Sequence, residues 1–224
     1  MDKVLSSSQA RIEHDKIKRS CIWSVSNIWS EEECKHYIEA TETMGYESID
    51  WEYAPEYRNC QRVLTLSETV SKDLWLRLRK HLTKEAVDFV RPFGFGNEGV
   101  WIPLGINAAL RFTKYGKGHY FKPHRDGSFV HDANLRSVYT VMIYLNEDFE
   151  GGETRFFHTH KNERYLTSND FDAFHVRPAT GTCLIFNHDV SGTKYISHIT
   201  NKSHMLCITI LFLFFILYYV SALS

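Results

Sequence analysis

The sequence predicts an α+β chain in which two helices come first and many short strands, arranged as a β-sandwich or barrel, follow. Three observations support this class. Apolar residues recur at helical spacing in the first part of the chain, the segments after Ile106 are short and β-rich, and glycine-bearing turns separate several of them. A length of 224 residues with 43% apolar and 24% charged residues fits one globular domain with a sizeable core.

The two helices are expected in a support region, residues 21–105, which follows a flexible N-terminus over residues 1–20. Ser30 and Glu33 form a capping box, and the apolar residues after it keep helical spacing. A second helix is expected over residues 70–90, because apolar residues line one side of that segment. A proline and a glycine just beyond it end the helix.

Seven short strands are expected in the second part of the chain. Each segment is rich in β-branched and aromatic residues, and a turn-forming glycine precedes several of them. The expected strands cover residues 108–115, 119–124, 137–145, 153–157, 173–177, 182–186 and 193–199.

Composition and motifs exclude several classes of protein. With 26 basic and 27 acidic residues the net charge is −1, so the chain has no excess of positive charge that would favour binding to nucleic acid. The five cysteines are scattered and form no CxxC pair, which argues against a disulfide framework or a structural zinc site. A GxGxxG match at residues 94–99 indicates a loop, because prolines flank it and the motifs of kinases and dinucleotide folds are missing around it.

His124-Arg125-Asp126, at the end of an alternating segment, indicates a metal site. Side chains two positions apart in an extended strand point to the same face. An imidazole and a carboxylate held side by side form two thirds of a two-histidine, one-carboxylate iron(II) site, which leaves coordination positions open for substrates. On its own this triplet is weak evidence, because most His-x-Asp triplets are solvated surface residues.

Residues 205–223 form a run of 19 residues without a charge. As a helix the run would be about 28 Å long, close to the roughly 30 Å hydrocarbon core of a bilayer. The alternative is a buried terminal strand, but the run is about three times longer than an average strand of 5 to 6 residues. We therefore expect a transmembrane helix that anchors the protein and leaves its domain in the cytosol, the alternative location being that of a soluble cytoplasmic protein.

Four segments of the chain resemble a known family: RFTKYGKGHYFKPHRDG, YTVMIYLNEDFEGGETRFF, VRPATGTCLIFNHD and SGTKY. In this order they resemble the 2-oxoglutarate- and iron(II)-dependent dioxygenases, and most closely the prolyl 4-hydroxylase-like branch. The resemblance covers roughly residues 108–196. It implies a double-stranded β-helix, or jelly-roll, over residues 106–200, with the metal at its mouth and the preceding helices as a supporting layer.

The resemblance assigns roles to individual residues. His124 and Asp126 fall on the first two iron ligands, and Lys194 falls on the basic residue that pairs with the distal carboxylate of 2-oxoglutarate. Tyr115 matches a pocket tyrosine that donates a hydrogen bond to the same carboxylate, and the pair Gly151-Gly152 has a backbone role at the start of a strand. The alternatives are a surface lysine for Lys194 and a core aromatic for Tyr115.

The sequence departs from the family where the third metal ligand belongs. The family places a histidine about ten residues before the basic residue, but that position is occupied by Leu184, inside the preceding strand. His188 resembles the family's upstream, non-coordinating histidine, so the third ligand stays unassigned. Compared with the family, the sequence is truncated by roughly eight residues, which include most of a strand, and the loss of a strand is expected to leave backbone groups unpaired.

The implied function is an oxygenase that uses iron(II), 2-oxoglutarate as co-substrate, dioxygen and L-ascorbate as reductant. It would decarboxylate 2-oxoglutarate to succinate and hydroxylate a protein or peptide side chain, with peptidyl proline the leading candidate. One alternative is a catalytically impaired or inactive membrane-attached binding domain of the same fold. Another is a cupin-like metalloprotein that never used 2-oxoglutarate.

Overall fold

The computed structural model describes residues 4–5, 22–82, 100–124, 126–132, 134–158, 171–188, 197–200 and 205–217. Two α-helices lie in the first part of the chain, α1 (Glu31–Met44) and α2 (Glu68–Leu78), and a short 3-10 helix (Arg79–His81) follows α2. The strands are β1 (Val4–Leu5), β2 (Ile22–Val25), β3 (Glu47–Ser48), β4 (Arg58–Asn59), β5 (Gln61–Leu66), β6 (Val100–Ile106), β7 (Ala109–Tyr115), β8 (Tyr120–His124), β9 (Leu135–Tyr144), β10 (Thr154–His158), β11 (Phe171–Val176), β12 (Cys183–Asn187), β13 (Ser197–Thr200) and β14 (Met205–Leu217).

Within these ranges the strands form two sheets. The small sheet has the order β1-β11-β10-β13-β8-β4. The large sheet has the order β2-β12-β9-β14-β7-β5-β3, and β6 pairs with β14 beside this path. Most neighbouring strands are antiparallel, while β1 and β11 run parallel. The chain is therefore rich in strands and has few helices, as the sequence predicts.

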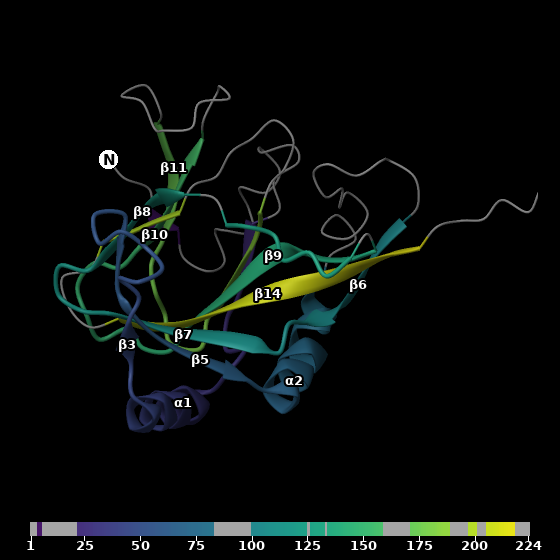
Figure 1. Cartoon of the computed structure of the whole chain (residues 1–224), viewed down its shortest axis with the longest axis horizontal. Coiled ribbons are helices and arrows are strands. Elements are labelled where there is room, and N and C mark those ends of the chain that lie inside the picture. Colours follow the sequence, from purple (N-terminus) through teal and green to yellow (C-terminus); the bar gives the residue numbers. More distant parts are fainter. Residues whose placement is uncertain are drawn as a thin grey trace, which may run out of the picture.

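The large sheet lies between the two helices and the small sheet (Figure 1). Alternation along β9 shows why: Val141 and Ile143 belong to the core cluster shared with the helices, whereas Met142 and Tyr144 belong to the cluster shared with the small sheet. Because both faces of the large sheet are covered, almost every residue of β9 is buried. The inter-sheet cluster, Ile22, Tyr115, Phe121, Met142, Tyr144, Phe156, Val176, Leu184 and Phe186 among others, is the layer that carries the candidate site.

The helices pack on the large sheet, and an ion pair joins them to each other. The capping box of α1 is confirmed, with the Ser30 side chain accepting from the Glu33 backbone and the Glu33 side chain accepting from the Ser30 backbone. Arg77 of α2 binds both carboxylate oxygens of Glu33, at 2.6 and 2.9 Å, and thereby joins the two helices. The second helix was expected to reach residue 90; it ends at Leu78, and residues 83–99 lie outside the described residues.

The expected transmembrane helix over residues 205–223 is wrong. Residues 205–217 form β14, whose first half lies between β9 and β7 and whose second half lies between β9 and β6 (Figure 1). A continuous apolar run suits a strand that is covered on both faces, which periodicity alone cannot distinguish from a membrane helix. No helix among the described residues is long and apolar enough to cross a membrane. The predicted tail-anchored location was based on this segment and therefore loses its support. The location of the protein stays a prediction.

The same strand bears on a second expectation, that the loss of a family strand leaves backbone groups unpaired. β14 supplies partners to β9 over residues 135–144 and to β7 over residues 111–115, while residues 189–196, where the missing segment belongs, lie outside the described residues. The other expected strands are confirmed within one to four residues, as β7 to β13. The N-terminal segment was expected to be flexible; of it the structure describes only β1, which pairs with β11.

Candidate functional site

The site begins where β8 ends. The imidazole Nε2 of His124 lies 3.1 Å from Oδ1 of Asp126, and their side chains are only 6% and 21% exposed. The two residues therefore do face the same space, as the spacing of one residue predicts for extended backbone. Their roles as metal ligands stay predictions, because the geometry alone does not test them.

The contacts of the His124 ring indicate which of its two nitrogens carries the proton. Nδ1 lies 2.7 Å from the carbonyl oxygen of Lys122, and a carbonyl only accepts, so Nδ1 is the donor of that bond. In a neutral ring Nε2 then presents a lone pair to the Asp126 carboxylate. Two acceptors 3.1 Å apart repel each other unless a proton or a metal cation lies between them.

The surroundings hold both side chains in place. The ring of Phe121 stacks on His124 with centroids 3.4 Å apart and an angle of 18°. The hydroxyl of Thr140, on β9, donates to Oδ2 of Asp126 at 2.5 Å and so joins the two sheets through the site. Partners of this kind, behind a ligating histidine and carboxylate, orient metal ligands in proteins.

The charges around Asp126 favour its ionised form. Burial by itself would raise the pKa of the carboxyl, but a proton on Nε2 of His124, which adds a charge and a hydrogen bond, and the hydrogen bond from Thr140 bring that pKa well below its usual range. An ionised carboxylate in a largely enclosed position requires a cationic partner.

His188, just after β12, is the third polar side chain at this position. It is 6% exposed, its Nδ1 lies 3.3 Å from Oγ of Ser128, and its Nε2 has no hydrogen-bond partner among the described residues. Burial lowers the pKa of the ring, with Asp126 acting in the opposite direction, so the neutral form with a free lone pair prevails. Across the described ranges, no three histidine, cysteine or acidic side chains form a group that could hold a metal ion.

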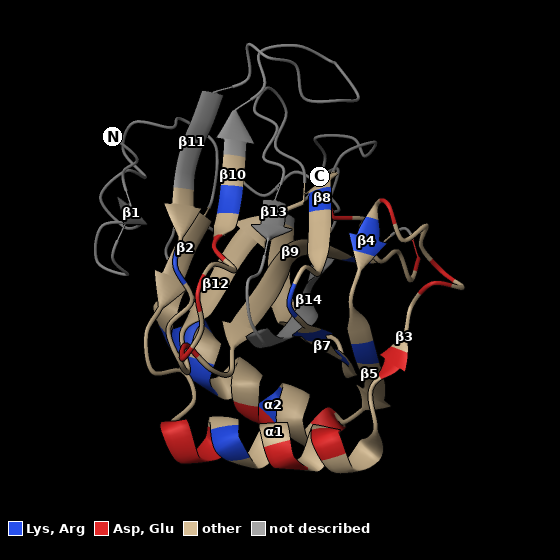
Figure 2. Cartoon of the chain, turned by 90° about the vertical axis from the view of Figure 1, so that its left-hand side faces the viewer, with Lys and Arg blue, Asp and Glu red and all other residues tan. Residues whose placement is uncertain are grey.

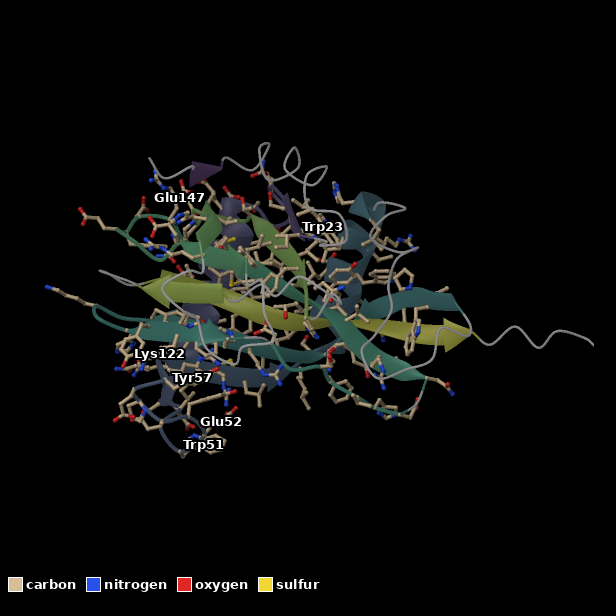
Figure 3. The ribbon with its side chains drawn as sticks, turned by 90° about the horizontal axis from the view of Figure 1, so that it is seen from above. Trp23, Trp51, Glu52, Tyr57, Lys122 and Glu147 are labelled. Atoms are coloured by element: carbon tan, nitrogen blue, oxygen red, sulfur yellow. The ribbon has the colours of Figure 1, made fainter. Side chains whose placement is uncertain are left out.

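A cluster of aromatic side chains and one arginine lies next to His124 on the strand β4 and the loop before it. The ring of Tyr57 meets that of His124 edge-on at 6.4 Å, and the Tyr57 carbonyl accepts from the Lys122 backbone at 2.9 Å. Figure 3 shows Tyr57 and Lys122 on one side of the molecule with Glu52 and Trp51 beyond them. Arg58 hydrogen-bonds Tyr115, which is 1% exposed in the inter-sheet cluster.

Some of the site residues predicted from the sequence lie together in the structure, and one lies outside the described residues. It brings His124 and Asp126 together and places Tyr115 in the same layer between the sheets. Lys194 lies outside the described residues. Gly151 and Gly152 have φ values of 82° and 74° just before β10, which agrees with the backbone role expected for them.

Sequence reasoning missed two residues of this site. Thr140 had a usable signal, because it is a polar residue on the same face of β9 as the buried Met142 and Tyr144. Arg58 had none, since it stands in a tyrosine-rich segment without periodicity, far from the motifs in sequence.

Comparisons with known proteins agree with this arrangement. Residues 110–209 match the family described as the 2OG-Fe(II) oxygenase superfamily. A comparison with curated proteins finds no match.

Solved structures with a similar fold include several prolyl hydroxylases. The viral collagen prolyl hydroxylase of Paramecium bursaria Chlorella virus-1 is 18% identical, with a TM-score of 0.53 over 86% of this chain and 95% of that one. A Pseudomonas putida prolyl-4-hydroxylase is 14% identical, with a TM-score of 0.53 over 91% and 97% of the two chains. A Trichoplax adhaerens prolyl hydroxylase, in complex with a hypoxia inducible factor peptide fragment, is 13% identical, with a TM-score of 0.55 over 92% and 88%.

The family match covers the segment that contains both His124 and Asp126, and the structural likeness extends over most of the chain. The fold implied by both is a jelly-roll, which agrees with the two packed sheets. Residues 110–209 are therefore similar to the 2OG-Fe(II) oxygenase superfamily, and the chain shares its fold with solved prolyl hydroxylases.

Proposed function

We propose that the protein is an iron(II)- and 2-oxoglutarate-dependent dioxygenase that hydroxylates a protein side chain, with peptidyl proline as the leading substrate. The two sheets would close as a double-stranded β-helix around the inter-sheet cluster. The prolyl hydroxylases of similar fold, one of them in complex with a peptide, support a peptide substrate. L-ascorbate is the proposed reductant that keeps the iron in its ferrous state.

The observation that carries the proposal is the facing pair of acceptors, Nε2 of His124 and Oδ1 of Asp126. A neutral imidazole beside an ionised carboxylate is a donor set that suits iron(II). The buried Nε2 of His188, which lies close to Asp126 and has no hydrogen-bond partner among the described residues, also fits a site that a cation completes. His124 and Asp126 would hold the metal, which would supply oxygen activation coupled to the decarboxylation of 2-oxoglutarate.

The side chains around the metal would orient it and shape the space for substrate. Lys122 and Thr140 fix the ligands through hydrogen bonds, and Phe121 prevents the His124 ring from turning. Tyr57, which is exposed and meets the His124 ring edge-on, is placed to contact the substrate as it approaches. Lys194 and Tyr115 are the proposed partners of the distal carboxylate of 2-oxoglutarate.

The direct test measures succinate formed from 2-oxoglutarate in the presence of iron(II), ascorbate and oxygen. We expect turnover by the full chain, and its loss in the variants His124→Ala and Asp126→Ala. The matched control is Asp148→Ala, which removes an exposed carboxylate after β9. Mass spectrometry of proline-containing peptides then shows whether a substrate gains one oxygen atom.

Three other outcomes would change the assignment. No succinate at saturating iron would favour a binding domain of this fold without turnover. Metal-dependent activity that survives Lys194→Ala and does not need 2-oxoglutarate would favour a cupin-like metalloprotein. Turnover without oxidation of any proline would retain the oxygenase and reject prolyl hydroxylation.

A further inference from the structure

The ring of Phe121 lies between a cation and a candidate metal ligand. The His124 ring is stacked on it, with centroids 3.4 Å apart and an angle of 18°. The guanidinium carbon of Arg58 lies over the same ring, 4.2 Å from its centre, because β4 pairs with β8 through Arg58 and Phe121 (Figure 2). An imidazole at contact distance fills one face of the phenyl ring, so the guanidinium occupies the other face. The three groups form a stack with Phe121 in the middle.

Two aromatic rings do not favour this arrangement by themselves. Aromatic pairs prefer offset or edge-to-face geometries, because the negative faces of two rings repel each other when one ring lies directly over the other. The Phe121 and His124 rings lie close to that unfavourable face-to-face geometry. A guanidinium is attracted to the face of an aromatic ring within roughly 6 Å of its centre, and it draws electron density away from the opposite face. The cation of Arg58 therefore offsets the repulsion between the two rings.

Arg58 is itself held in place. Its guanidinium donates hydrogen bonds to the hydroxyl of Tyr115 and to the sulfur of Cys60, and both of these side chains are only 1% exposed. No carboxylate forms an ion pair with Arg58 in the part of the chain that the structure describes, since Glu52 pairs with Arg62. Nothing in that part of the chain therefore draws the cation away from the Phe121 ring.

The orientation of the His124 ring decides whether its Nε2 can bind a metal. Nδ1 lies 2.7 Å from the carbonyl oxygen of Lys122, and Nε2 lies 3.1 Å from Oδ1 of Asp126. Rotation of the imidazole about its bond to Cβ would move both nitrogens away from these positions. The Phe121 ring prevents that rotation only as long as it keeps its own place, and a group that fixes a ligating histidine raises metal affinity.

We propose that Arg58 is a positioning residue that holds the His124 ring in its metal-binding orientation by acting through Phe121. Arg58 lies on β4, outside the segment that matches the oxygenase family. The metal-binding role of His124 rests on the proposed function, whereas the effect of Arg58 on the orientation of the ring does not.

The first experiment needs no metal. The ring protons of His124 lie over the face of Phe121, so they resonate upfield in the NMR spectrum of the full chain, and the spectrum of His124→Ala identifies them. We expect Arg58→Gln to move these signals towards those of an unstacked imidazole, and Arg58→Lys, which keeps the cation, to move them less. The matched control is Arg62→Gln, which breaks the ion pair with Glu52 and should leave the signals in place. Unchanged His124 signals in Arg58→Gln overturn the proposal.

Calorimetric titration with manganese(II) measures the consequence for metal binding. Arg58→Gln and Phe121→Leu should each weaken the affinity about 10-fold, as for the loss of a group that orients a metal ligand. The double variant should bind no more weakly than Phe121→Leu alone, because Arg58 acts through that ring. Effects that add, or an affinity in Arg58→Gln equal to that of Arg62→Gln, contradict the proposal.

Thermal unfolding of each variant separates positioning from a general loss of structure. A purely structural role of Arg58 would lower the unfolding temperature and leave the His124 signals and the manganese(II) affinity of the folded protein unchanged, which overturns the proposal. Arg58→Met, which keeps the length of the side chain without its charge, replaces Arg58→Gln if that variant does not fold, and the same shifts are expected.

The two experiments also separate this inference from the proposed function. Failure of the unchanged chain to bind manganese(II) rejects the proposed function, whereas the NMR signals of the metal-free chain still decide whether Arg58 orients His124. Manganese(II) binding and succinate formation by the unchanged chain, with neither the signals nor the affinity altered in Arg58→Gln, retain the oxygenase and reject the role of Arg58.

Discussion

The hydroxyl of Thr140 on β9 donates a hydrogen bond of 2.5 Å to Oδ2 of Asp126, which follows β8. The donor belongs to the large sheet and the acceptor follows a strand of the small sheet, so this one bond fixes the carboxylate relative to both. Thr140→Val keeps the shape of the side chain and removes the donor. We expect it to weaken metal binding about 10-fold, since the loss of a partner behind a metal ligand typically costs 10- to 100-fold in affinity.

Titration with manganese(II) or cobalt(II) measures this effect without any need for turnover. The control is Thr154→Val, which removes the buried 2.7 Å hydrogen bond between Thr154 and Tyr144 in the same inter-sheet layer. That variant should lose stability and keep its metal affinity. If both variants bind metal equally well, Thr140 has only a structural role.

Gly181→Ala should destabilise the fold strongly. Gly181 has a φ of 72°, and a Cβ at this position would lie 2.1 Å from the carbonyl oxygen of Trp29. The close approach arises because the Gly181 carbonyl accepts from the Ile28 backbone at 2.9 Å and thereby joins the start of β12 to the loop before α1. We expect the free energy of unfolding to fall by about 3 kcal/mol or more.

Chemical denaturation at neutral pH measures that loss. Gly105→Ala provides the comparison, because nothing lies within 4 Å of the added carbon there and the backbone needs no positive φ. A Gly181→Ala protein as stable as the Gly105→Ala protein would contradict the reason given.

The ion pair between Glu33 and Arg77 should make stability depend on pH in the acidic range. The hydrogen bond from Arg77 lowers the pKa of Glu33 below its ordinary value of 4.5, against the opposing effect of burial. A carboxyl with a lowered pKa in the folded state stabilises the protein above its ordinary pKa, and this contribution is lost as the pH falls through the lower, folded-state value. Both side chains are about one third exposed, so about 0.5 to 1 kcal/mol is expected.

Urea unfolding of the unchanged chain and of Glu33→Gln, each at pH 7 and pH 3, gives the difference. The variant should be less stable at pH 7, and the gap should narrow at pH 3 because the unchanged chain loses the same ion pair. Glu39→Gln serves as the control, since Glu39 makes only an exposed pair with Lys35. A gap that stays constant with pH would show that the pair does not titrate.

Ile208→Pro should prevent the large sheet from forming. Ile208 of β14 is paired with Ile143 of β9 on one side and with Phe112 of β7 on the other, so its N–H faces a partner strand in either direction. Proline removes that donor, and the cost is about 1 to 3 kcal/mol for the unsatisfied acceptor in addition to the strain of the ring. Ile208→Val, which keeps the N–H and the branched shape, is the control.

Circular dichroism and cooperative urea unfolding report whether each protein is folded. A segment that spanned a membrane as a helix would instead tolerate a proline near its end and would keep the rest of the chain folded in both variants. A normally folded Ile208→Pro protein would thus restore the original expectation for residues 205–223.

The sequence predicted the parts of the fold that local patterns determine. The capping box at Ser30 identified the start of α1, and β-rich segments separated by glycine-bearing turns identified β7 to β12, because each signal depends on neighbouring residues alone. The spacing of His124 and Asp126 likewise depends on local geometry, so their approach to 3.1 Å was predictable. The end of α2 at Leu78 was not, since the apolar pattern continues beyond it.

The features that the sequence did not predict depend on pairing between strands far apart in the chain. The run at residues 205–217 has the composition of both a membrane helix and a fully covered strand, and only its pairing with β9, β7 and β6 distinguishes them. Arg58 approaches Tyr115 and Phe121 because β4 pairs with β8 across the sheet, a contact that no local pattern indicates. Thr140 was within reach, because a polar residue at an inward position of a strand requires a partner.

The place of β14 has a consequence for how the protein comes to be folded in a cell. β9 and β7 are translated long before residues 205–217, yet the edge of each strand that faces β14 has no partner in the large sheet until that segment leaves the ribosome. During this delay the nascent chain exposes two apolar edges that are prone to pair with other chains, so its yield depends on chaperones and on the speed of synthesis. Slow-growing cultures at low temperature should therefore give more native protein than rapid expression does.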